Sequence, residues 1–439
     1  MSLGQDSFLA ELPDGWTFDR FKDIALLRNE RTDEASEVED YLELEDLESG
    51  TGRILNRRNT MDVVSDVTVF KKGDVLFGKL RPYLEKYYVA EFDGKCTGEI
   101  LAFKPKRIES RFLFYCMASS WFIERCNMLA YGAKMPRVNW PTQLAQFNLP
   151  ISPLSEQQRI TAYLDASCKA IDAAVDAKRR QIETLNAINK AIITKAVTSG
   201  ITTSVELRSS GVEWIGEIPS HWKVEKLKYL TSLIVDGTHI TPTYLPDGVP
   251  FLRVTDIQDH TIDLGNVKYI SPDEHQLLSK RARARRDDIL LSKNGTIGVV
   301  KIVNWDWDFS FFVSICLLRP HKKLNPHYFS YFFESSLVDQ QLSESSKKTS
   351  VTNLHIVKIR ELLISLPPPD EQSKIVQYLQ FKCAEVQSLK GNITNQITTL
   401  TAYHNSLIHE CVTGQRRVTE EDVQRAAHIN SIFTGEHKT

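Results

Sequence analysis

The stretch 73–80, GDVLFGKL, comes close to the nucleotide-binding pattern in which glycine, four residues, glycine and lysine precede a serine or threonine. In such a loop the final hydroxyl binds Mg²⁺ and a helix follows at once. Here the final position is Leu80, which cannot ligate a metal, and Pro82 stands where the helix should begin. We therefore interpret the stretch as a strand and a turn that end in a basic residue.

Three other patterns could suggest a catalytic or metal site. The stretch 325–328, NPHY, is similar to the Asn-Pro-Pro-Tyr motif of amino-methyltransferases. No Gly-rich loop after a strand accompanies it, so a proline at the start of a helix explains it better. Nuclease chemistry would need paired carboxylates and a lysine in one cluster, and Asp176 and Lys178 lie on a helical stretch with no carboxylate partner in view. His404 and His409 are five residues apart, which is poor spacing for a shared metal. We expect no active site, metal or cofactor on this chain.

Basic and hydrogen-bonding side chains recur at matching places in the two halves of the sequence. Phosphate contact and base-edge readout need lysine, arginine, asparagine and threonine on loops, with glycine where the backbone approaches DNA closely. A solvated charged surface is the alternative interpretation. The candidate DNA contacts are Lys79, Arg81, Tyr83, Lys86, Lys134 and Arg137 in the first half, and Thr238, His239, Arg253, Lys293, Asn294, Thr296, Lys347, Lys348 and Thr349 in the second.

The composition narrows the class of protein. With 439 residues, 42% of them hydrophobic, the chain has room for two or three folded domains. No apolar run approaches the ~18 residues of a membrane span and the first residues lack a signal pattern, so we expect neither a membrane nor a secreted protein. Seven cysteines without a Cys-x-x-Cys pair indicate reduced packing residues of a cytoplasmic protein. Because the net charge is only −2, a nucleic-acid site would depend on local patches.

Two stretches related by a constant offset of 215 residues organise the rest of the chain. Residues 153–200 and 368–415 align without a gap, and in both the apolar residues step alternately by three and four. That spacing is typical of a coiled-coil seam, so we predict two long helices that pair with each other. The expected seam positions are Leu164, Ile171, Ile182, Leu185, Asn189 and Ile192 in the first copy, and Leu379, Val386, Ile393, Ile397, Leu400, His404 and Leu407 in the second.

The segments that precede these helices, 1–152 and 201–367, align more loosely. Trp16 matches Trp222, and short apolar runs separated by Gly, Asp and Lys turns predict strands at equivalent places. We predict an α+β domain with a small, twisted, mostly antiparallel sheet and aromatic-rich helices, present twice as a pseudo-two-fold internal repeat. The aromatic-rich helices should cover 111–129 and 326–342, residues 201–220 should be a linker, and 416–439 should be a polar, partly helical tail.

The ordered set of these patterns, present twice, resembles the specificity subunit of type I restriction-modification systems over essentially the whole chain. The strand, Gly-Asp and basic-loop pattern of that family is found at 72–83. The pattern that precedes its conserved helix is found at 149–160 and again at 364–375. The stretch 236–242, DGTHITP, resembles a loop of its recognition domains. One departure is Asp287, where the family has glycine, so a non-glycine residue must hold the turn.

The resemblance implies a DNA-recognition subunit with no catalytic activity of its own. Two target-recognition domains, 1–152 and 201–367, would each bind one half of an asymmetric, interrupted site in double-stranded DNA. The helices at 153–200 and 368–415 would pair antiparallel and set the distance between the half-sites.

The resemblance also implies partners in the cytoplasm of a prokaryote. These are two methyltransferase subunits that carry S-adenosylmethionine, and two restriction motor-nuclease subunits that use ATP and Mg²⁺. An enzyme in its own right, as a DNA methyltransferase or nuclease, is one alternative, and a coiled-coil scaffold without DNA specificity is the other.

Overall fold

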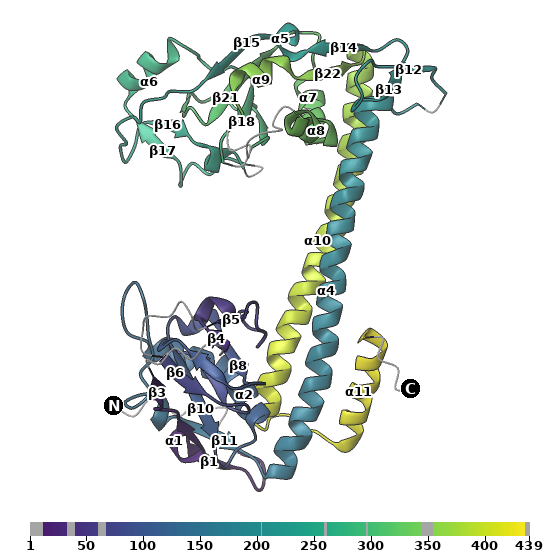
Figure 1. Cartoon of the computed structure of the whole chain (residues 1–439). Coiled ribbons are helices and arrows are strands. Elements are labelled where there is room, and N and C mark those ends of the chain that lie inside the picture. Colours follow the sequence, from purple (N-terminus) through teal and green to yellow (C-terminus); the bar gives the residue numbers. More distant parts are fainter. Residues whose placement is uncertain are drawn as a thin grey trace. The chain divides into compact units, whose positions relative to one another are not determined.

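The computed structural model of the chain describes residues 12–32, 40–59, 67–202, 204–258, 261–295, 297–344 and 354–434. The chain forms two compact units: unit 1 comprises Met1–Arg179 and Thr394–Thr439, and unit 2 comprises Arg180–Ile393. Each unit holds one mixed α/β domain and part of each of two long helices (Figure 1). The middle of the sequence therefore makes one unit, and its two ends together make the other.

In unit 1 the central strands are covered on both faces. Val75, Phe77 and Phe103 pack into the core that contains the helices, whereas Leu76 and Ala102 pack into a second core against another sheet. Because side chains alternate along a strand, a strand covered on both faces needs an uninterrupted apolar run. The four-stranded antiparallel sheet has the order β2 (Ala25–Leu27), β10 (Ile100–Pro105), β7 (Val75–Gly78), β8 (Tyr87–Val89). The five-stranded sheet has the order β3 (Arg31–Thr32), β6 (Val67–Phe70), β9 (Gly94–Cys96), β4 (Asp40–Leu42), β5 (Arg58–Asn59), and β1 (Thr17–Arg20) pairs with β11 (Asn148–Ile151).

Unit 2 repeats this design. Ile289 and Leu291 pack toward the helices, whereas Leu290 packs toward a second sheet. The four-stranded sheet has the order β15 (Thr231–Asp236), β21 (Ile315–Pro320), β18 (Ile289–Ser292), β19 (Val300–Ile302). The second sheet has the order β17 (Lys268–Ile270), β16 (Val249–Leu252), β20 (Ser310–Phe311), and β14 (Lys223–Lys226) pairs with β22 (Leu363–Leu366). Of the pairs between described strands, only β4 with β9 and β16 with β20 run parallel, so the predicted fold class is confirmed, with several sheets in each unit.

Each aromatic-rich helical stretch is a pair of helices divided at a serine. In unit 1, α2 (Ser110–Ala118) ends at Ser119, whose hydroxyl accepts from the Phe122 N–H and caps α3 (Ser120–Leu129). In unit 2, α7 (Pro326–Glu334) ends at Ser335, and α8 (Ser336–Glu344) follows. The predicted helices are therefore present, with a break that the apolar pattern alone did not indicate.

Helices α4 (Leu154–Ser199) and α10 (Pro369–Val412) begin and end within three residues of the predicted bounds. In unit 1 the start of α4 packs on the end of α10, where Leu164 shares a core with Leu407. In unit 2 the end of α4 packs on the start of α10, where Val197 shares a core with Leu379. Within each unit the two helices therefore run antiparallel. All the predicted seam residues are buried or half-buried.

The segment predicted to be a linker is a folded hairpin. Strands β12 (Leu207–Ser209) and β13 (Glu217–Pro219) pair antiparallel, and Ile218 lies fully buried in the core of unit 2. The Arg208 guanidinium donates to the carbonyls of Ser220 and Trp222 at 3.0 and 2.6 Å, which closes the hairpin onto the following strand. The tail contains α11 (Glu420–Thr434), a helix that the sequence predicted only in part.

All seven cysteines are free, six of them buried and Cys383 half-buried. Burial raises the pKa of Cys96, Cys316 and Cys411 to about 12. A thiol with such a pKa stays protonated at neutral pH and is a poor nucleophile or metal ligand. These cysteines are packing residues.

Candidate nucleic-acid interface

In the first domain two loops lie against each other beyond the end of β7. The Val138 N–H donates to the Lys79 carbonyl at 3.0 Å, and the Arg81 guanidinium donates to the Lys134 carbonyl at 3.2 Å. Arg81 has a φ of 52°, in the left-handed region, and the Tyr83 ring that follows is 53% exposed. The fold thus gathers four of the predicted DNA contacts on one surface.

The other two predicted contacts of this domain are engaged within the protein. Lys86 Nζ donates to the Leu47 carbonyl. Arg137 Nε donates to the Glu99 carboxylate at 3.1 Å, and this hydrogen bond raises the pKa of Arg137. A cation with a local partner must give up that partner, or share it, to bind a phosphate. Lys86 and Arg137 therefore hold the two loops in place rather than extending freely from them.

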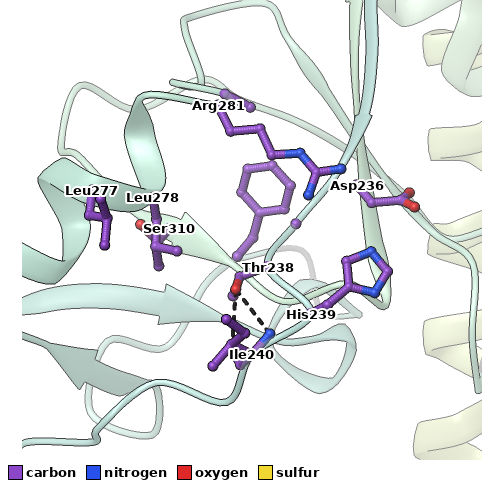
Figure 2. A pocket seen from close by; sticks show the side chains of 11 residues that line it. Asp236, Thr238, His239, Ile240, Leu277, Leu278, Arg281 and Ser310 are labelled. Atoms are coloured by element: carbon purple, nitrogen blue, oxygen red, sulfur yellow. Dashed lines mark hydrogen bonds between the residues drawn. The ribbon is translucent and has the colours of Figure 1, made fainter.

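In the second domain the loop after β15 forms one wall of a pocket of about 300 Å³ (Figure 2). Gly237 is required in this loop because a Cβ there would lie 2.2 Å from the Phe311 carbonyl oxygen. Thr238 Oγ1 accepts from the Ile240 N–H at 3.2 Å, and this bond closes the turn that carries His239. The His239 side chain is exposed at the mouth of the pocket.

The opposite wall comes from α6 (Pro272–Ser279) and the residues that follow it. Figure 2 shows Leu277 and Leu278 on the helix, with Arg281 extending from the segment beyond it toward the side where His239 lies. A thymine methyl group fits an apolar contact, and a guanine edge fits an arginine. The pocket therefore combines the two kinds of group that read base edges in the major groove.

Sequence reasoning missed Arg281 and the basic run to which it belongs. Residues 280–286 read KRARARR, so arginines alternate with the half-buried Ala282 and Ala284 and extend toward solvent. Arg283 and Arg286 pair with Asp308 and Asp306 at 3.0 and 3.1 Å. Within the described part of the chain, the guanidinium groups of Arg281 and Arg285 form no ion pair. The sequence alone could have indicated this run, because it is the densest cluster of cations in the chain and lies directly before a predicted strand.

Lys293 is placed differently from the prediction. Its side chain is only 6% exposed, and its Nζ pairs with Asp236 at 2.8 Å. Asp236 directly precedes Gly237, so the buried pair anchors the loop that forms the pocket wall. Because a buried, paired ammonium does not face solvent, Lys293 positions this loop and is not free to make the contact that the sequence predicted for it.

The remaining predicted contacts divide into three groups. The Arg253 guanidinium donates to the Asp256 carboxylate at 3.0 and 2.8 Å, within a short 3₁₀ turn. Asn294 is half-buried, and its Oδ1 atom is shielded from solvent. Four residues lie outside those that the structure describes: Thr296, Lys347, Lys348 and Thr349.

His275 on α6 connects the pocket wall to the second sheet. Its Nδ1 lies 2.9 Å from Ser310 Oγ, and Ser310 lines the pocket. Burial lowers the pKa of His275, and the nearby Arg283 lowers it further, whereas Asp308 acts in the opposite direction. The folded protein therefore favours the neutral imidazole over the protonated one.

The described residues contain no group of three or more His, Cys, Asp or Glu side chains that could hold a metal ion. Among the same residues, no helix combines the length and the apolar character needed to cross a membrane.

Comparison with known proteins identifies the family. The sequence profile described as "Type I restriction modification DNA specificity domain" matches residues 13–184 and 219–399, which is most of the chain and both of its repeats. The chain belongs to this family. The predicted resemblance is confirmed, and the two matched segments correspond to the two repeats of the fold.

Individual relatives are more distant. The EcoBI specificity subunit of Escherichia coli is 26% identical over 280 residues, which cover 61% of this chain and 58% of that subunit. The EcoKI specificity subunit of Escherichia coli strain K12 is 23% identical over 320 residues, covering 71% and 66%. The match thus spans about 60% of the length of these relatives. One chain in a solved structure of a type I R-M system is similar with a TM-score of 0.69 and 22% identity, over 92% of this chain and 100% of that chain, and this likeness supports the fold.

Proposed function

We propose that this chain is the non-catalytic DNA-recognition subunit of a type I restriction-modification complex. The observation that carries the proposal is that the two domains share the same arrangement of core strands and helices but carry different surface loops at equivalent positions. After β7 the first domain has Lys79, Arg81 and Tyr83, whereas at the equivalent place after β18 the second domain has the buried Lys293 and the half-buried Asn294. The pocket of the second domain, with His239 and Arg281, lies instead beyond β15, the counterpart of β2. A shared core with divergent basic loops is what a protein needs to read two unlike half-sites of one bipartite target.

Within each domain we assign the DNA contacts by whether each side chain reaches solvent or is held by a neighbouring group of the protein. In the first domain, Lys79, Tyr83 and Lys134 are the proposed DNA-facing residues, and Arg81, whose guanidinium donates to the Lys134 carbonyl, is assigned to holding the two loops together. In the second domain they are Thr238, His239 and Arg281, together with the predicted contacts outside the described residues. Lys86, Arg137, Arg253 and Lys293 are assigned to positioning the loops, because each is engaged with a neighbouring carboxylate or carbonyl.

The long helices are proposed to fix the gap between the half-sites and to dock the other subunits. Methyltransferase subunits, two per complex, would supply S-adenosylmethionine chemistry on adenine, and restriction subunits would supply ATP-dependent motor and nuclease activity. The half-buried polar seam residues Asn189 and His404 support a defined register, since polar seam residues favour one alignment over others.

Exchange of the first recognition domain tests the proposal. Residues 1–152 are replaced by the corresponding domain of a relative with a different target, and the methylated positions in DNA exposed to the assembled complex are mapped. One half of the target should change and the other half should stay. A complex that keeps both halves would contradict the proposal, as would methylation or cleavage of DNA by the purified chain alone.

A further inference from the structure

In unit 1 the tail helix α11 covers one face of the long helices. Val418 and Ala426 are buried in the core that contains Tyr163 and Leu164 of α4. The Arg159 Nε donates to the Val418 carbonyl at 2.8 Å. The Arg159 guanidinium also reaches Glu420, in the acidic first turn of α11, at 3.7 Å. The face thus recognises an amphipathic helix through an apolar stripe and a cation at one end.

The offset of 215 residues places the equivalent face on α10 in unit 2. Tyr163 and Ala166 correspond to Tyr378 and Phe381. Phe381 is 63% exposed, and Leu389, the equivalent of Ala174, is 52% exposed. The remaining correspondences are Ala170 to Glu385, Tyr403 to Ile188, which is 45% exposed, and Arg159 to Lys374, which is also exposed.

Among the described residues, no second helix like α11 covers this face. After α4 it continues into the β12–β13 hairpin, whereas after α10 it continues into α11. Exposed aromatic and aliphatic side chains in a row on a helix are typical of a surface that another helix covers. The repeat-related face shows what fits such a surface, namely an amphipathic helix with an acidic first turn.

Helix α11 is held mainly through its first turns. Beyond Ala426, Ile429 is 42% exposed and Phe433 is 56% exposed, and they border an apolar pocket of about 300 Å³ against Ala174 and Leu400. Helices with few buried contacts open at low cost in free energy. An element held in this way can be displaced by a partner that covers the same face more completely.

We propose that α11 masks one of two equivalent docking faces for an amphipathic helix of the methyltransferase subunit. The inference rests on the proposed function, since it needs that subunit as the partner. The exposed face of α10 at Tyr378, Phe381 and Leu389 binds the first methyltransferase subunit. The second copy binds unit 1 only when α11 leaves, so assembly proceeds in two unequal steps.

Titration of the full chain with the methyltransferase subunit of the same system, followed by native mass spectrometry, tests the proposal. The two steps should differ in dissociation constant by at least about fivefold, the lower end of usual coupling between sites. Ala426→Asp, which places a charge in the α11 contact, should strengthen the second step and bring the two within about twofold of each other. The matched control is Ala427→Asp, on an exposed position of the same helix, which should leave both steps unchanged.

A second measurement uses the unaltered chain, so it does not depend on the stability of a variant. The amides of α11 should lose protection from hydrogen exchange only as the second equivalent binds. Phe381→Asp should abolish the first step, and Gln380→Asp, on an exposed neighbour, should not. Equal steps in the unaltered chain, or protection of α11 that persists in the fully loaded complex, would overturn the masking proposal while leaving the proposed function intact. No association of the methyltransferase subunit with any of these chains would overturn both.

Discussion

The Asp288 carboxylate accepts two hydrogen bonds from the Arg319 guanidinium, from Nε at 2.8 Å and from Nη2 at 2.6 Å. Asp74, at the equivalent place in the first domain, is bound in the same bidentate way by Arg28. The two arginines come from different parts of the repeat, since Arg28 follows β2 and Arg319 lies on β21. The buried carboxylate is therefore the constant part of the turn, and its cation comes from the adjacent strand β21 in the second domain and from the end of the next strand but one, β2, in the first.

Arg319→Ala should destabilise unit 2 by about 3 kcal/mol, because it leaves the Asp288 carboxylate, 2% exposed, without its cation. Hydrogen exchange at the amides of β18 and β21 measures the effect in that unit. Arg286→Ala is the matched control, since its pair with Asp306 is exposed on both sides, and it should change little. Equal protection in both variants would contradict the role given to the buried pair.

Asp287→Gly should stabilise unit 2 by about 0.5 kcal/mol. Asp287 has a φ of 65°, a region that costs energy for a residue with a Cβ, and the equivalent Gly73 has a φ of 89°. The reverse change, Gly73→Ala, should destabilise unit 1 by about 1 kcal/mol, although a Cβ there would meet no atom within 4 Å. Thermal unfolding measures both changes. If both changes had the same sign, backbone conformation would not be the cause.

Arg281→Ala should weaken binding to target DNA by about 1–3 kcal/mol and relax the base preference at one position. Arg283→Ala should have a smaller effect, because Arg283 is already paired with Asp308. Competition assays at fixed salt with targets altered one base pair at a time measure both effects. A uniform loss across all sequences would show that Arg281 contacts a phosphate and not a base.

Unit 2 should lose stability as the pH falls from about 7 to about 5. Burial lowers the pKa of His275 below its ordinary value of about 6.5, so protonation is less favourable in the folded than in the unfolded chain. Its contribution is complete above the ordinary pKa and is lost as the pH falls through the folded one. His275→Gln should reduce the difference in unfolding midpoint between the two pH values. An undiminished difference would assign the pH dependence to other groups.

Insertion of one heptad into each long helix, after Arg179 and after Asn395, should lengthen the gap between methylated half-sites. Seven helical residues add about 10 Å, so the gap should grow by at most about three base pairs. The half-sites themselves should be unchanged in a map of methylated positions. Replacing a heptad without changing the length is the control. A complex that still methylates only the original spacing would contradict the proposed role of these helices.

The long helices were predictable because their signal is local and repeated. Most turns of residues 153–200 carry the same apolar spacing, and the second copy repeats it at a constant offset, so the bounds agree to within three residues. The central strands were also predictable, because burial on both faces makes runs such as 289–291 continuously apolar. These features depend only on neighbours in the sequence.

The candidate site was predictable only in part. Whether a basic side chain is free to bind DNA depends on whether the fold brings a carboxylate or a carbonyl next to it, and such partners are far away in the sequence. Lys293 has the type and the place of a DNA contact, and only the fold shows that Asp236 pairs with it from 57 residues away. The hairpin at 207–219 looked like a linker because its few apolar residues, such as Ile218, acquire a core only from the rest of unit 2.

The contact of Gly414 with the beginning of the first domain has a consequence for the order of synthesis. A Cβ on Gly414, at the end of α10, would lie 2.7 Å from the Pro13 ring, so the last turn of that helix closes against one of the first described residues of the chain. Unit 2 is one continuous segment, whereas unit 1 needs both ends of the sequence. On the ribosome, unit 1 is therefore completed only after all of unit 2 has been made, and until then the apolar face of Tyr163 and Leu164 lacks the end of α10 and the tail that cover it.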